Sequence, residues 1–468
     1  MVDAPPAVPL RALEQLRRGF EGDVITPTDP AYDDRRRLWN ALLDRRPALI
    51  LRPRTAAEVA IALRFAREHE LEIAVRAGGH SHEGVRGADG GLVVDLTAMR
   101  GVEVDAAARR AVANGGALLG ELDIAAQKHG LVCPVGVVGH TGVAGLTLGG
   151  GVGRLQRQFG LTVDQLFAVE IVTADGRIVR ASADEEPELF WGLRGAGWNF
   201  GVATRFEFRL QPFGPDLHRG VLVFPASEVE SAWAAFRAYG PQAPDAVSAI
   251  LGIDHAAPDA AYADEVAGRP IVMIAFNHSG RAEDVERDVA PLLAIPRRLD
   301  ATLGSQAYLE VQTAHDLELG WGHRSFIAGL NADDVHEGAF AELVDLVARA
   351  PGQGSFSVTA MGGAIGRVAE DAMAFAGRDA RFDLSADIAW SDPAQDEANR
   401  AWVRETMAVV EPDATLGRYA NENADAGPAH TRLLYGDAKL ARLAALKRAC
   451  DPDNVFRVNH NIAPSPDG

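Results

Sequence analysis

Two histidines follow a glycine pair at the end of a short apolar segment. In "AVRAGGHSHEG", residues 74–84, Arg76 is followed by Gly78 and Gly79, and then by His80 and His82. An imidazole can bind a metal or exchange a proton near neutral pH, and glycine lets the backbone approach a bound group closely. Two alternating histidines without a third ligand nearby are weak evidence for a metal site, so we expect none. The residues alone leave open a structural histidine and one that reacts with a bound group.

A second glycine cluster lies in "CPVGVVGHTGVAGLTLGGGVGR", residues 133–154. It contains Gly136, Gly139, Gly142, Gly145, Gly149, Gly150, Gly151 and Gly153. Glycine at this density lets backbone N–H groups surround a large anion, of which a pyrophosphate is the natural candidate. The residues between these glycines are Val, Leu, Ala and Thr rather than the polar residues of a flexible loop. We therefore expect a tightly packed turn system that binds an anion.

A Rossmann nicotinamide site would need G-x-G-x-x-G directly between a strand and a helix. "GGGVGR" lacks that spacing, and "RGAGWNFG", residues 194–201, follows an apparent helix, "ELFWGL". We therefore reject a Rossmann-type site.

Composition limits the class of protein. The chain of 468 residues is long enough for two or three domains. A net charge of −19 argues against nucleic acid or an anionic membrane as partner. Two cysteines imply no disulfide framework. The first twenty residues lack the pattern of a secretory signal, and no apolar run approaches the ~18–20 residues that span a bilayer, so we expect a cytoplasmic location.

The segment 49–96 predicts a β-α-β-turn-β unit, with strands "ALILRP", "LEIAV" and "GLVVDL". Its helix opens with a capping box formed by Thr55 and Glu58. Two hairpins follow at 103–116 and 167–182, the second with an Asp175-Gly176 turn, and a helix over 117–130 lies between them. The strand "GVATRFEFRLQP" should end at Pro212.

The pattern changes after Pro212. Between about 220 and 415, amphipathic helices such as "EVESAWAAFRAYG" alternate with strands such as "RPIVMIAFNHSG" and "RFDLSADIAWSD". This indicates a second α+β domain with a largely antiparallel sheet. The tail "DPDNVFRVNHNIAPSPDG" is rich in Asn for a chain end, so we expect it to be bound to the body of the protein.

Five motifs in this order carry a family resemblance: "RAGGHSHEG", "GVAGLTLGGGVGRLQRQFGL", "ELFWGLRGAGWNFG", "YANEN" and "DPDNVFRVNHNI". Together they resemble the vanillyl-alcohol-oxidase-type flavoproteins with a PCMH-type FAD-binding domain, in their berberine-bridge-enzyme-like branch, which includes bacterial hydroxynicotine oxidases. The resemblance implies an α+β fold. Its two-part FAD-binding domain would comprise residues 1–212 and 416–468, closed by a substrate domain, 213–415, that has an antiparallel sheet and flanking helices.

The resemblance also implies FAD bound covalently through His80, by an 8α-histidyl bond. The flavin-binding set that it implies is Arg76, Ala77, Gly78, Gly79, His80, Ser81, Gly139, Thr141, Gly142, Gly145, Gly149, Gly150, Gly151, Val152, Gly153, Ile171, Tyr419, Asn421, Asn459 and Asn461. Many relatives add a cysteinyl bond, but the family position falls on Val138, five residues after Cys133. We therefore expect no cysteinyl bond, with Cys133 packing as a small apolar residue.

The implied reaction moves a hydride from a C–H next to an OH or amine of a small organic molecule or natural product to flavin N5, while a base removes a proton. Molecular oxygen would be the acceptor, giving hydrogen peroxide, and Thr141 favours this oxidase behaviour over a dehydrogenase. Tyr419 is the candidate catalytic base, or it orients the substrate. Further substrate-side candidates are Gln312, His323, Arg324 and Arg378. The alternatives are a carbohydrate oxidase or dehydrogenase of the same family, and a flavin-binding protein without efficient turnover.

The position of Cys133 relative to the family's cysteine gives a first prediction. Cys133→Ala should leave the visible spectrum and the covalent flavin content of the purified protein unchanged, because Cys133 misses the attachment position by five residues. Peptide mapping checks this. Two attachment sites in the wild type that fall to one in the variant would show that the register is wrong.

Overall fold

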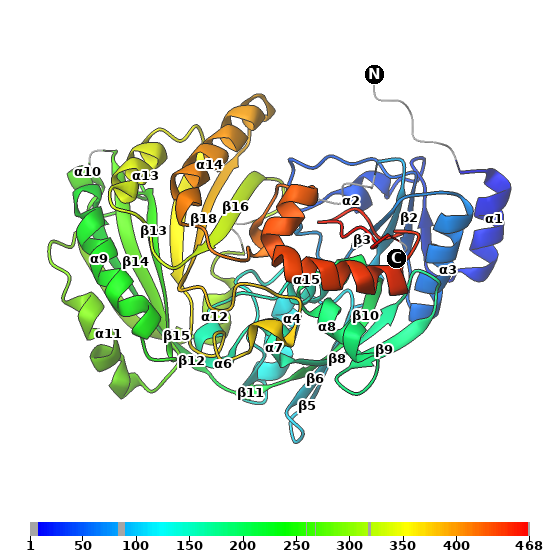
Figure 1. The fold of residues 1–468 in the computed structure, drawn as a ribbon, viewed down its shortest axis with the longest axis horizontal. Coiled ribbons are helices and arrows are strands. Elements are labelled where there is room, and N and C mark those ends of the chain that lie inside the picture. Colours follow the sequence, from blue (N-terminus) through cyan, green and yellow to red (C-terminus); the bar gives the residue numbers. More distant parts are fainter. Residues whose placement is uncertain (1–7, 83–88, 259, 267, 317–319, 467–468) are drawn as a thin grey trace.

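The structure, a computed structural model, describes residues 8–82, 89–258, 260–266, 268–316 and 320–466. It is an α+β fold in which a four-stranded, a five-stranded and a seven-stranded sheet lie side by side, with one further two-stranded sheet among the described residues (Figure 1). The C-terminal segment, drawn in red, returns to the half of the molecule formed by the N-terminal residues. No helix in these ranges is long and apolar enough to cross a membrane.

The first sheet has the order β1-β2-β4-β3. Its strands are β1 (Asp23–Ile25), β2 (Leu49–Arg52), β3 (Ile73–Arg76) and β4 (Leu92–Asp95), and α1 (Leu10–Gly19), α2 (Tyr32–Arg36) and α3 (Ala56–Glu68) accompany it. The predicted β-α-β-turn-β unit is confirmed, with β2 and β3 both parallel to β4. The predicted capping box is only half formed. Thr55 Oγ1 accepts the Glu58 N–H at 3.2 Å, but the Glu58 carboxylate accepts the N–H groups of Arg54 and Gly22 instead of that of Thr55.

The second sheet has the order β5-β6-β10-β8-β9 and contains both predicted hairpins. Its strands are β5 (Val102–Asp105), β6 (Arg110–Asn114), β8 (Leu166–Val172), β9 (Ile178–Ser182) and β10 (Val202–Arg209). The helices beside it include α4 (Leu119–Gln127), α5 (Val143–Leu148), α6 (Gln156–Phe159), α7 (Thr162–Gln165) and α8 (Pro187–Ala196). The strand expected to run to Pro212 ends at Arg209, because β11 (Gln211–Pro212) leaves it to pair with β7 (Leu131–Val132).

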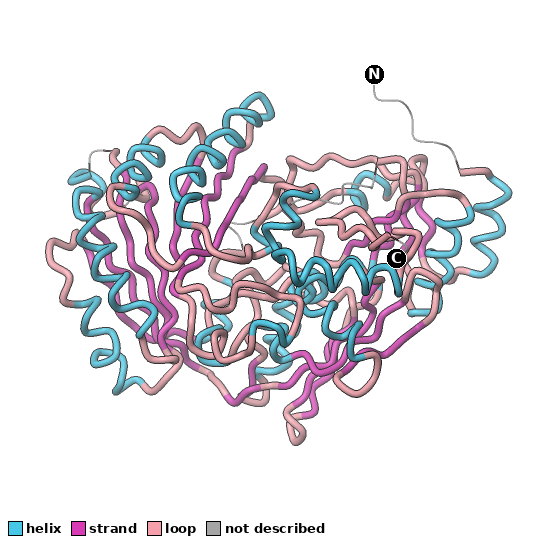
Figure 2. Tube along the Cα trace, in the orientation of Figure 1, coloured by secondary structure: helices cyan, strands magenta, loops and turns pink. Residues whose placement is uncertain are grey.

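The large sheet is antiparallel, with the order β15-β12-β14-β13-β17-β18-β16. Its strands are β12 (Asp216–Pro225), β13 (Val247–His255), β14 (Pro270–His278), β15 (Asp300–Ala307), β16 (Arg324–Ala332), β17 (Gln353–Ala360) and β18 (Phe382–Trp390). Helices α9 (Val229–Tyr239), α11 (Val285–Leu293), α13 (Ala339–Ala348) and α14 (Asp396–Val410) cover its outer face (Figure 2). The short α10 (Ala263–Val266) and α12 (Tyr308–Thr313) lie in its connections.

The inner face of the large sheet is polar along two neighbouring strands. Alternate residues of a strand share a face, so the apolar Phe382, Leu384 and Ala386 enter the core under the helices. Asp383, Ser385 and Asp387 then point to the opposite side, and they stand across from Thr359, Ser357 and Ser355 of β17. We call these six residues the polar face.

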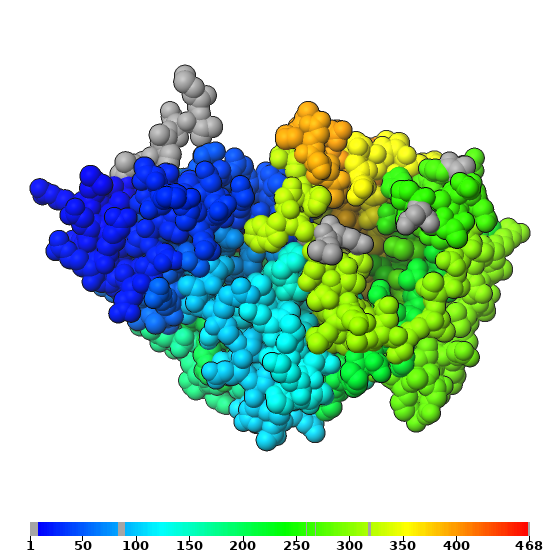
Figure 3. Space-filling model, turned by 180° about the vertical axis from the view of Figure 1, so that it is seen from behind, coloured from blue at the N-terminus to red at the C-terminus, as the bar shows by residue number. Residues whose placement is uncertain are grey.

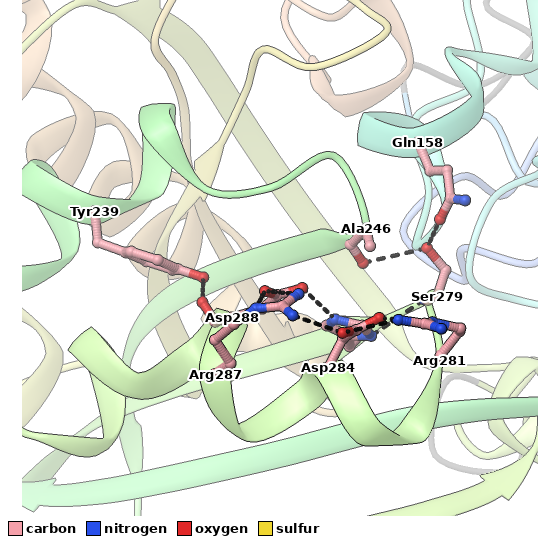
Figure 4. A network of polar contacts seen from close by, with 10 residues as sticks. Gln158, Tyr239, Ala246, Ser279, Arg281, Asp284, Arg287 and Asp288 are labelled. Atoms are coloured by element: carbon pink, nitrogen blue, oxygen red, sulfur yellow. Dashed lines mark hydrogen bonds and ion pairs between the residues drawn. The ribbon is translucent and has the colours of Figure 1, made fainter.

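Buried polar contacts join the glycine-rich half to the large sheet. Arg157 donates to the carbonyl groups of Met361 and Ala243, the latter at 2.7 Å. Arg378 Nη2 forms an ion pair with Asp164 Oδ1 at 2.6 Å, and the Arg378 side chain is fully buried. Near the surface, Gln158 of α6 accepts the hydroxyl of Ser279 just after β14, beside the Arg281–Asp284–Arg287 ion pairs (Figure 4).

The C-terminal segment is bound to the N-terminal half, as the sequence predicts. Within α15 (Pro428–Cys450), Lys447 Nζ donates to the carbonyl oxygens of Asn199 and Phe456, and to Asp451 Oδ2 at 2.7 Å. Lys447 and Asp451 are almost completely buried. This return of the chain supports the division into residues 1–212, 213–415 and 416–468, which stays our proposal.

Lys447→Met should destabilise the protein by about 3–5 kcal/mol, because it leaves the carboxylate of Asp451 buried without its partner cation. Chemical denaturation, monitored by tryptophan fluorescence, measures the loss. The exposed Lys128→Met is the matched control and should stay within about 0.5 kcal/mol of wild type. Equal stabilities of the two variants would contradict the structural role of Lys447.

Candidate active site

The two glycine clusters of the sequence touch each other through their backbones. A Cβ on Gly78 would lie 2.1 Å from the Gly142 nitrogen, and a Cβ on Gly142 would lie 2.4 Å from the Gly78 nitrogen. Any side chain at either position would therefore separate the loops. The backbone N–H groups of Gly78 to Ser81 make no hydrogen bond to other described residues. A loop with free N–H groups, closely packed against a second glycine loop, is suited to hold an anion such as a pyrophosphate.

The triple glycine brings three distant segments together. A Cβ on Gly149 would lie 2.3 Å from Asn421 Oδ1, and one on Gly150 would lie 2.6 Å from the Phe375 ring. One on Gly151 would lie 2.3 Å from Thr162 Oγ1. In contrast, no atom lies within 4 Å of the Cβ position of Gly145, which is exposed. The triple glycine therefore leaves room for the side chains of Asn421, Phe375 and Thr162. The backbone at Gly145, by contrast, faces an open surface.

His80 lies at the centre of an aromatic group. Its ring stacks on Trp39 at 4.9 Å, with an angle of 18° between the planes, and Trp321 stands edge-on at 6.3 Å. His80 Nε2 lies 2.6 Å from His140 Nδ1. Burial, aided by His140 and His82, lowers the pKa of His80 to about 3. The ring is therefore neutral near pH 7 and keeps a lone pair on one nitrogen.

Asp316 and Trp321, which follow α12 in the sequence, contact this group. Asp316 Oδ1 accepts the Gly139 N–H at 2.7 Å, and its backbone carbonyl oxygen lies 3.2 Å from His140 Nε2. The Arg76 guanidinium lies 5.7 Å from the centre of the Trp321 ring. In Figure 3, yellow-green parts of the chain lie between the N-terminal residues in blue and cyan and the green part of the chain. Sequence reasoning did not identify Trp39, His140 or Asp316.

Tyr419 is buried beside the glycine run. Its hydroxyl oxygen accepts the Val152 N–H at 3.2 Å and the Asn421 side-chain amide at 2.9 Å. Burial raises the pKa of Tyr419 above its usual value, and the negative charge of Glu422 adds to this, although the two hydrogen bonds oppose the shift. The phenol therefore keeps its proton near neutral pH. Of the two roles predicted for Tyr419, this environment favours orienting a substrate.

Three carboxyl groups interact electrostatically, and sequence reasoning missed them; one of them, Glu422, also acts on Tyr419. Asp383 and Asp387 belong to the polar face, and Glu422 comes from the "YANEN" motif. Burial, followed by repulsion from Asp387, raises the pKa of Glu422 to about 7. Burial raises the pKa of Asp387 to about 6, and burial with repulsion from Glu422 raises that of Asp383 well above its usual value. The alternation of "RFDLSADIAW" could have placed both aspartates on one face.

Asp383 carries the clearest sign that this acidic group faces a ligand. It is 6% exposed, and no hydrogen bond or ion pair of its side chain to another described residue is found. Asp387 and Glu422 are only partly buried. A buried carboxyl without a partner is costly, so Asp383 suits a site that is completed by a bound molecule.

Three of the four predicted substrate-side residues have protein partners. The Gln312 amide donates to Asp123 at 3.1 Å and to the Gly136 carbonyl at 2.9 Å. Arg324 forms a two-bond ion pair with Asp396, and Arg378 pairs with Asp164 as described above. These contacts fit structural roles. His323 is exposed, and its backbone carbonyl accepts the Ala41 N–H.

The remaining residues that the sequence predicts to bind flavin lie in different environments. Thr141 is half-buried and precedes Gly142 at the contact of the two loops. The side-chain oxygens of Asn459 and Asn461, in the C-terminal tail, are buried without a hydrogen bond within the described residues. Ile171 is fully buried in β8, where it packs against Gly201. The two amide oxygens are therefore polar groups that a bound cofactor could satisfy.

Together these features suit FAD. The paired glycine loops offer N–H groups for a pyrophosphate, the neutral His80 lies beside them, and the tail leaves two buried amide oxygens unpaired. A two-part binding region of this kind, facing an antiparallel sheet with a polar inner face, defines a flavin-dependent oxidoreductase.

Comparison with known proteins agrees with this class. Residues 47–182 match the model of the FAD binding domain, and residues 418–463 match the model described as berberine and berberine like. The (R)-6-hydroxynicotine oxidase of Paenarthrobacter nicotinovorans is 33% identical over 458 residues, which are 95% of this chain and 97% of that protein. An FAD-linked oxidoreductase of Dictyostelium discoideum is 29% identical over 97% of both chains.

Solved structures show the same fold. The 6-hydroxy-D-nicotine oxidase from Arthrobacter nicotinovorans superposes with a TM-score of 0.83 at 29% identity, covering 95% of this chain and 98% of that one. The glucooligosaccharide oxidase from Acremonium strictum, whose flavin is named 6-S-cysteinyl, 8α-N1-histidyl FAD, gives 0.85 at 22% identity over 97% and 100%. The chain belongs to the family of berberine-like FAD-linked oxidoreductases that includes the hydroxynicotine oxidase, and it is an FAD-dependent oxidoreductase.

Glu422→Gln should stabilise the protein at high pH only. The pKa of Glu422 is raised to about 7 in the folded protein, whereas an unfolded glutamate ionises near 4.3, so the wild type loses stability as pH rises from about 4 through 7. Glutamine does not titrate. The variant should gain about 1–2 kcal/mol at pH 8, an amount reduced for the partial exposure of the carboxyl, and nothing at pH 4.

Thermal unfolding at the two pH values measures this difference. The exposed Glu103→Gln is the control and should show no dependence on pH relative to wild type. A Glu422→Gln variant that is equally stabilised or destabilised at both pH values would refute the raised pKa.

Proposed function

We propose that the protein is an FAD-dependent oxidase for a small amine or alcohol. It would remove a hydride from the C–H next to the amine or OH and pass it to flavin N5, with molecular oxygen as acceptor and hydrogen peroxide as product. One observation carries this proposal: Tyr419 lies beside the glycine run that would hold FAD, and the charge of Glu422, which is itself close enough to Asp387 to be repelled by it, acts on Tyr419. The names of the hydroxynicotine oxidases support the oxidase activity.

The FAD is attached through His80 alone. His80 is neutral, is fixed by Trp39 and His140, and stands beside the Gly78–Gly142 contact. The histidyl flavin named for the Acremonium enzyme supports an attachment of this kind. Cys133 is fully buried, and burial raises its thiol pKa, so the reactive thiolate is disfavoured there. The flavin supplies the redox chemistry when bound, and the protein supplies its position and electrostatics.

The residues that hold the FAD divide into three groups. The N–H groups from Gly78 to Ser81 face the pyrophosphate, together with the open backbone around Gly145. Gly149, Gly150 and Val152 lie beside Asn421, Phe375 and Tyr419, where the flavin ring would meet the substrate side. Asn459 and Asn461 offer their buried amide oxygens from the C-terminal tail.

The acidic group takes the substrate proton. A general base works best with a pKa near the operating pH, and Asp387 at about 6 and Glu422 at about 7 meet this condition. Asp387 is also held in place, since its Oδ1 accepts the Ser355 hydroxyl at 2.7 Å. Tyr419, whose oxygen already accepts two hydrogen bonds, donates its O–H to orient the substrate.

Two kinds of substrate fit the site. A cationic amine would be attracted by the carboxyl groups, and this agrees with the hydroxynicotine oxidases. A carbohydrate is the second candidate, because the Ser and Thr hydroxyls of the polar face can bind sugar hydroxyls and because several solved neighbours are oligosaccharide oxidases. Thr141 beside the loop contact favours oxygen as acceptor, and a cytoplasmic location stays our expectation from the sequence.

A substrate panel tests the proposal. Amines, alcohols and oligosaccharides are mixed with the protein without oxygen, and bleaching of the flavin absorbance identifies the substrate class; admitting oxygen should then release peroxide. Asp387→Asn should slow flavin reduction by about 10²–10⁴-fold, as the loss of a general base does. Tyr419→Phe should slow it by less than about tenfold, as the loss of one hydrogen bond does.

The pH dependence of flavin reduction distinguishes a residue that accepts the proton from one that only orients the substrate. Wild-type flavin reduction should rise between about pH 5 and 7 as the carboxyls ionise, and Tyr419→Phe should keep this rise. Asp345→Asn, on the exposed surface of α13, is the control and should behave as wild type. A Tyr419→Phe variant that is more than a hundredfold slower and lacks the rise with pH would assign the proton transfer to Tyr419 instead. No bleaching by any member of the panel would favour a flavin-binding protein without turnover.

A further inference from the structure

The hydrogen bond between two histidines has a direction that its neighbours determine. His80 Nε2 lies 2.6 Å from His140 Nδ1, and His140 Nε2 lies 3.2 Å from the backbone carbonyl oxygen of Asp316. A carbonyl oxygen can only accept, so His140 Nε2 carries a hydrogen and donates it. In the neutral ring Nδ1 of His140 is then the acceptor. His80 Nε2 must therefore donate, and the lone pair of His80 lies on Nδ1.

The surroundings keep this arrangement in place. The Asp316 carboxylate accepts the Gly139 N–H at 2.7 Å, so Asp316 binds two consecutive residues of the loop at two points. Trp39 stacks on His80 and fixes the plane of its ring. No hydrogen bond of His80 Nδ1 to another described residue is found. Of the two ring nitrogens, Nε2 is thus occupied by His140 and Nδ1 is left for a new bond.

We propose that His140 makes His80 Nδ1 the nucleophile that bonds to the flavin 8α-carbon, and that His140 accepts the Nε2 proton as this bond forms. The proposal rests on the histidyl attachment proposed above and assigns its control to a residue that touches His80 and not the substrate. His140 is therefore a positioning residue for attachment of the cofactor, separate from the acidic group that serves turnover.

The step balances in atoms and electrons. The Nδ1–C8α bond forms, and one C–H bond of the 8α-methyl group breaks. The electron pair of that C–H bond remains on the flavin, which is reduced by two electrons. Two protons are released, one from C8α and one from His80 Nε2 through His140, and they match the two that a fully reduced flavin takes up. Molecular oxygen, the acceptor of the proposed function, reoxidises the flavin.

Removal of the Nε2 proton has a physical reason. His80 would otherwise become a positively charged, alkylated imidazolium in a site where burial already opposes its protonation. A proton acceptor in hydrogen-bond contact removes this charge as it develops. General-base assistance of this kind is typically worth about 10²–10⁴-fold in rate.

The test follows attachment itself rather than turnover. Full-length protein, produced with little riboflavin, is incubated with excess FAD, and acid-stable flavin in the denatured protein is measured over time by gel fluorescence. The visible absorbance before acid treatment reports total bound FAD, attached or not. Wild type should become acid-stably labelled.

Three substitutions at one position vary only the partner of His80. His140→Asn keeps an acceptor oxygen and should label within about tenfold of the wild-type rate. His140→Ala removes the acceptor and should label about 10²-fold more slowly. His140→Lys offers only donors, so it forces the lone pair of His80 onto Nε2, and it should give no acid-stable flavin.

His129→Ala is the control. His129 is exposed, and no hydrogen bond or ring contact between it and His80 is found among the described residues, so the variant should label at the wild-type rate. Wild-type rates in His140→Ala, or equal labelling of His140→Asn and His140→Lys, would overturn the role of His140 and leave the attachment itself standing. A wild type that binds FAD but never becomes acid-stably labelled would instead refute the histidyl attachment, and with it this proposal.

Discussion

The contact between Gly78 and Gly142 is the constraint on which the site depends. Each glycine occupies the space that a Cβ of the other would need, so the two loops approach as closely as bare backbones allow. The His80 loop comes from the first sheet, and the second loop leads into α5 beside the second sheet. Their contact therefore fixes the two smaller sheets relative to each other and directs His80 towards His140.

The large sheet is joined to the glycine-rich half by buried charged side chains, and not by a close contact between glycines. Arg157 and Arg378 extend between the glycine-rich half and the sheet, and protein oxygens or a carboxylate satisfy both of them. Removing one partner of such a pair is costly, because it leaves an unpaired charge in the interior. Hence the large sheet is connected to the glycine-rich half in a defined orientation, and Glu422 acts electrostatically on both Tyr419 and Asp383 of the polar face.

Burial shifts the pKa values of the basic and the acidic groups of the site in opposite directions. Burial lowers the pKa of His80 to about 3 and keeps an imidazole neutral, while it raises the pKa of Glu422 to about 7. Both shifts have one origin, since a low dielectric disfavours whichever form is charged. The result is a neutral nitrogen where a bond to the cofactor is proposed, and carboxyls that change charge near neutral pH, as the proposed proton acceptor requires.

Much of the fold could be predicted from the sequence, because its signals are local. The β-α-β-turn-β unit, both hairpins and the Asp175-Gly176 turn depend on side-chain periodicity and on backbone angles within a few residues. Local patterns were less reliable at element ends. Glu58 bonds Arg54 and Gly22 rather than completing a capping box, and the strand before Pro212 ends early, because partners distant in sequence compete for these groups.

The sequence by itself determined the class of cofactor and the loops that would bind it, since glycine is needed wherever backbones meet and the motif order is specific. Only the tertiary structure decided which side chains complete the site. His140 lies 60 residues from His80, and Asp316 lies a further 176 from His140, so no periodicity connects them. Likewise, Gln312, Arg324 and Arg378 looked available as polar residues, but the folded chain satisfies them with protein partners, whereas no partner of the buried Asp383 carboxyl is found among the described residues. A polar group either binds another group of the protein or remains available to a ligand. Which of these occurs depends on its burial and on its hydrogen-bond or ion-pair partners, and both exist only once the chain has folded.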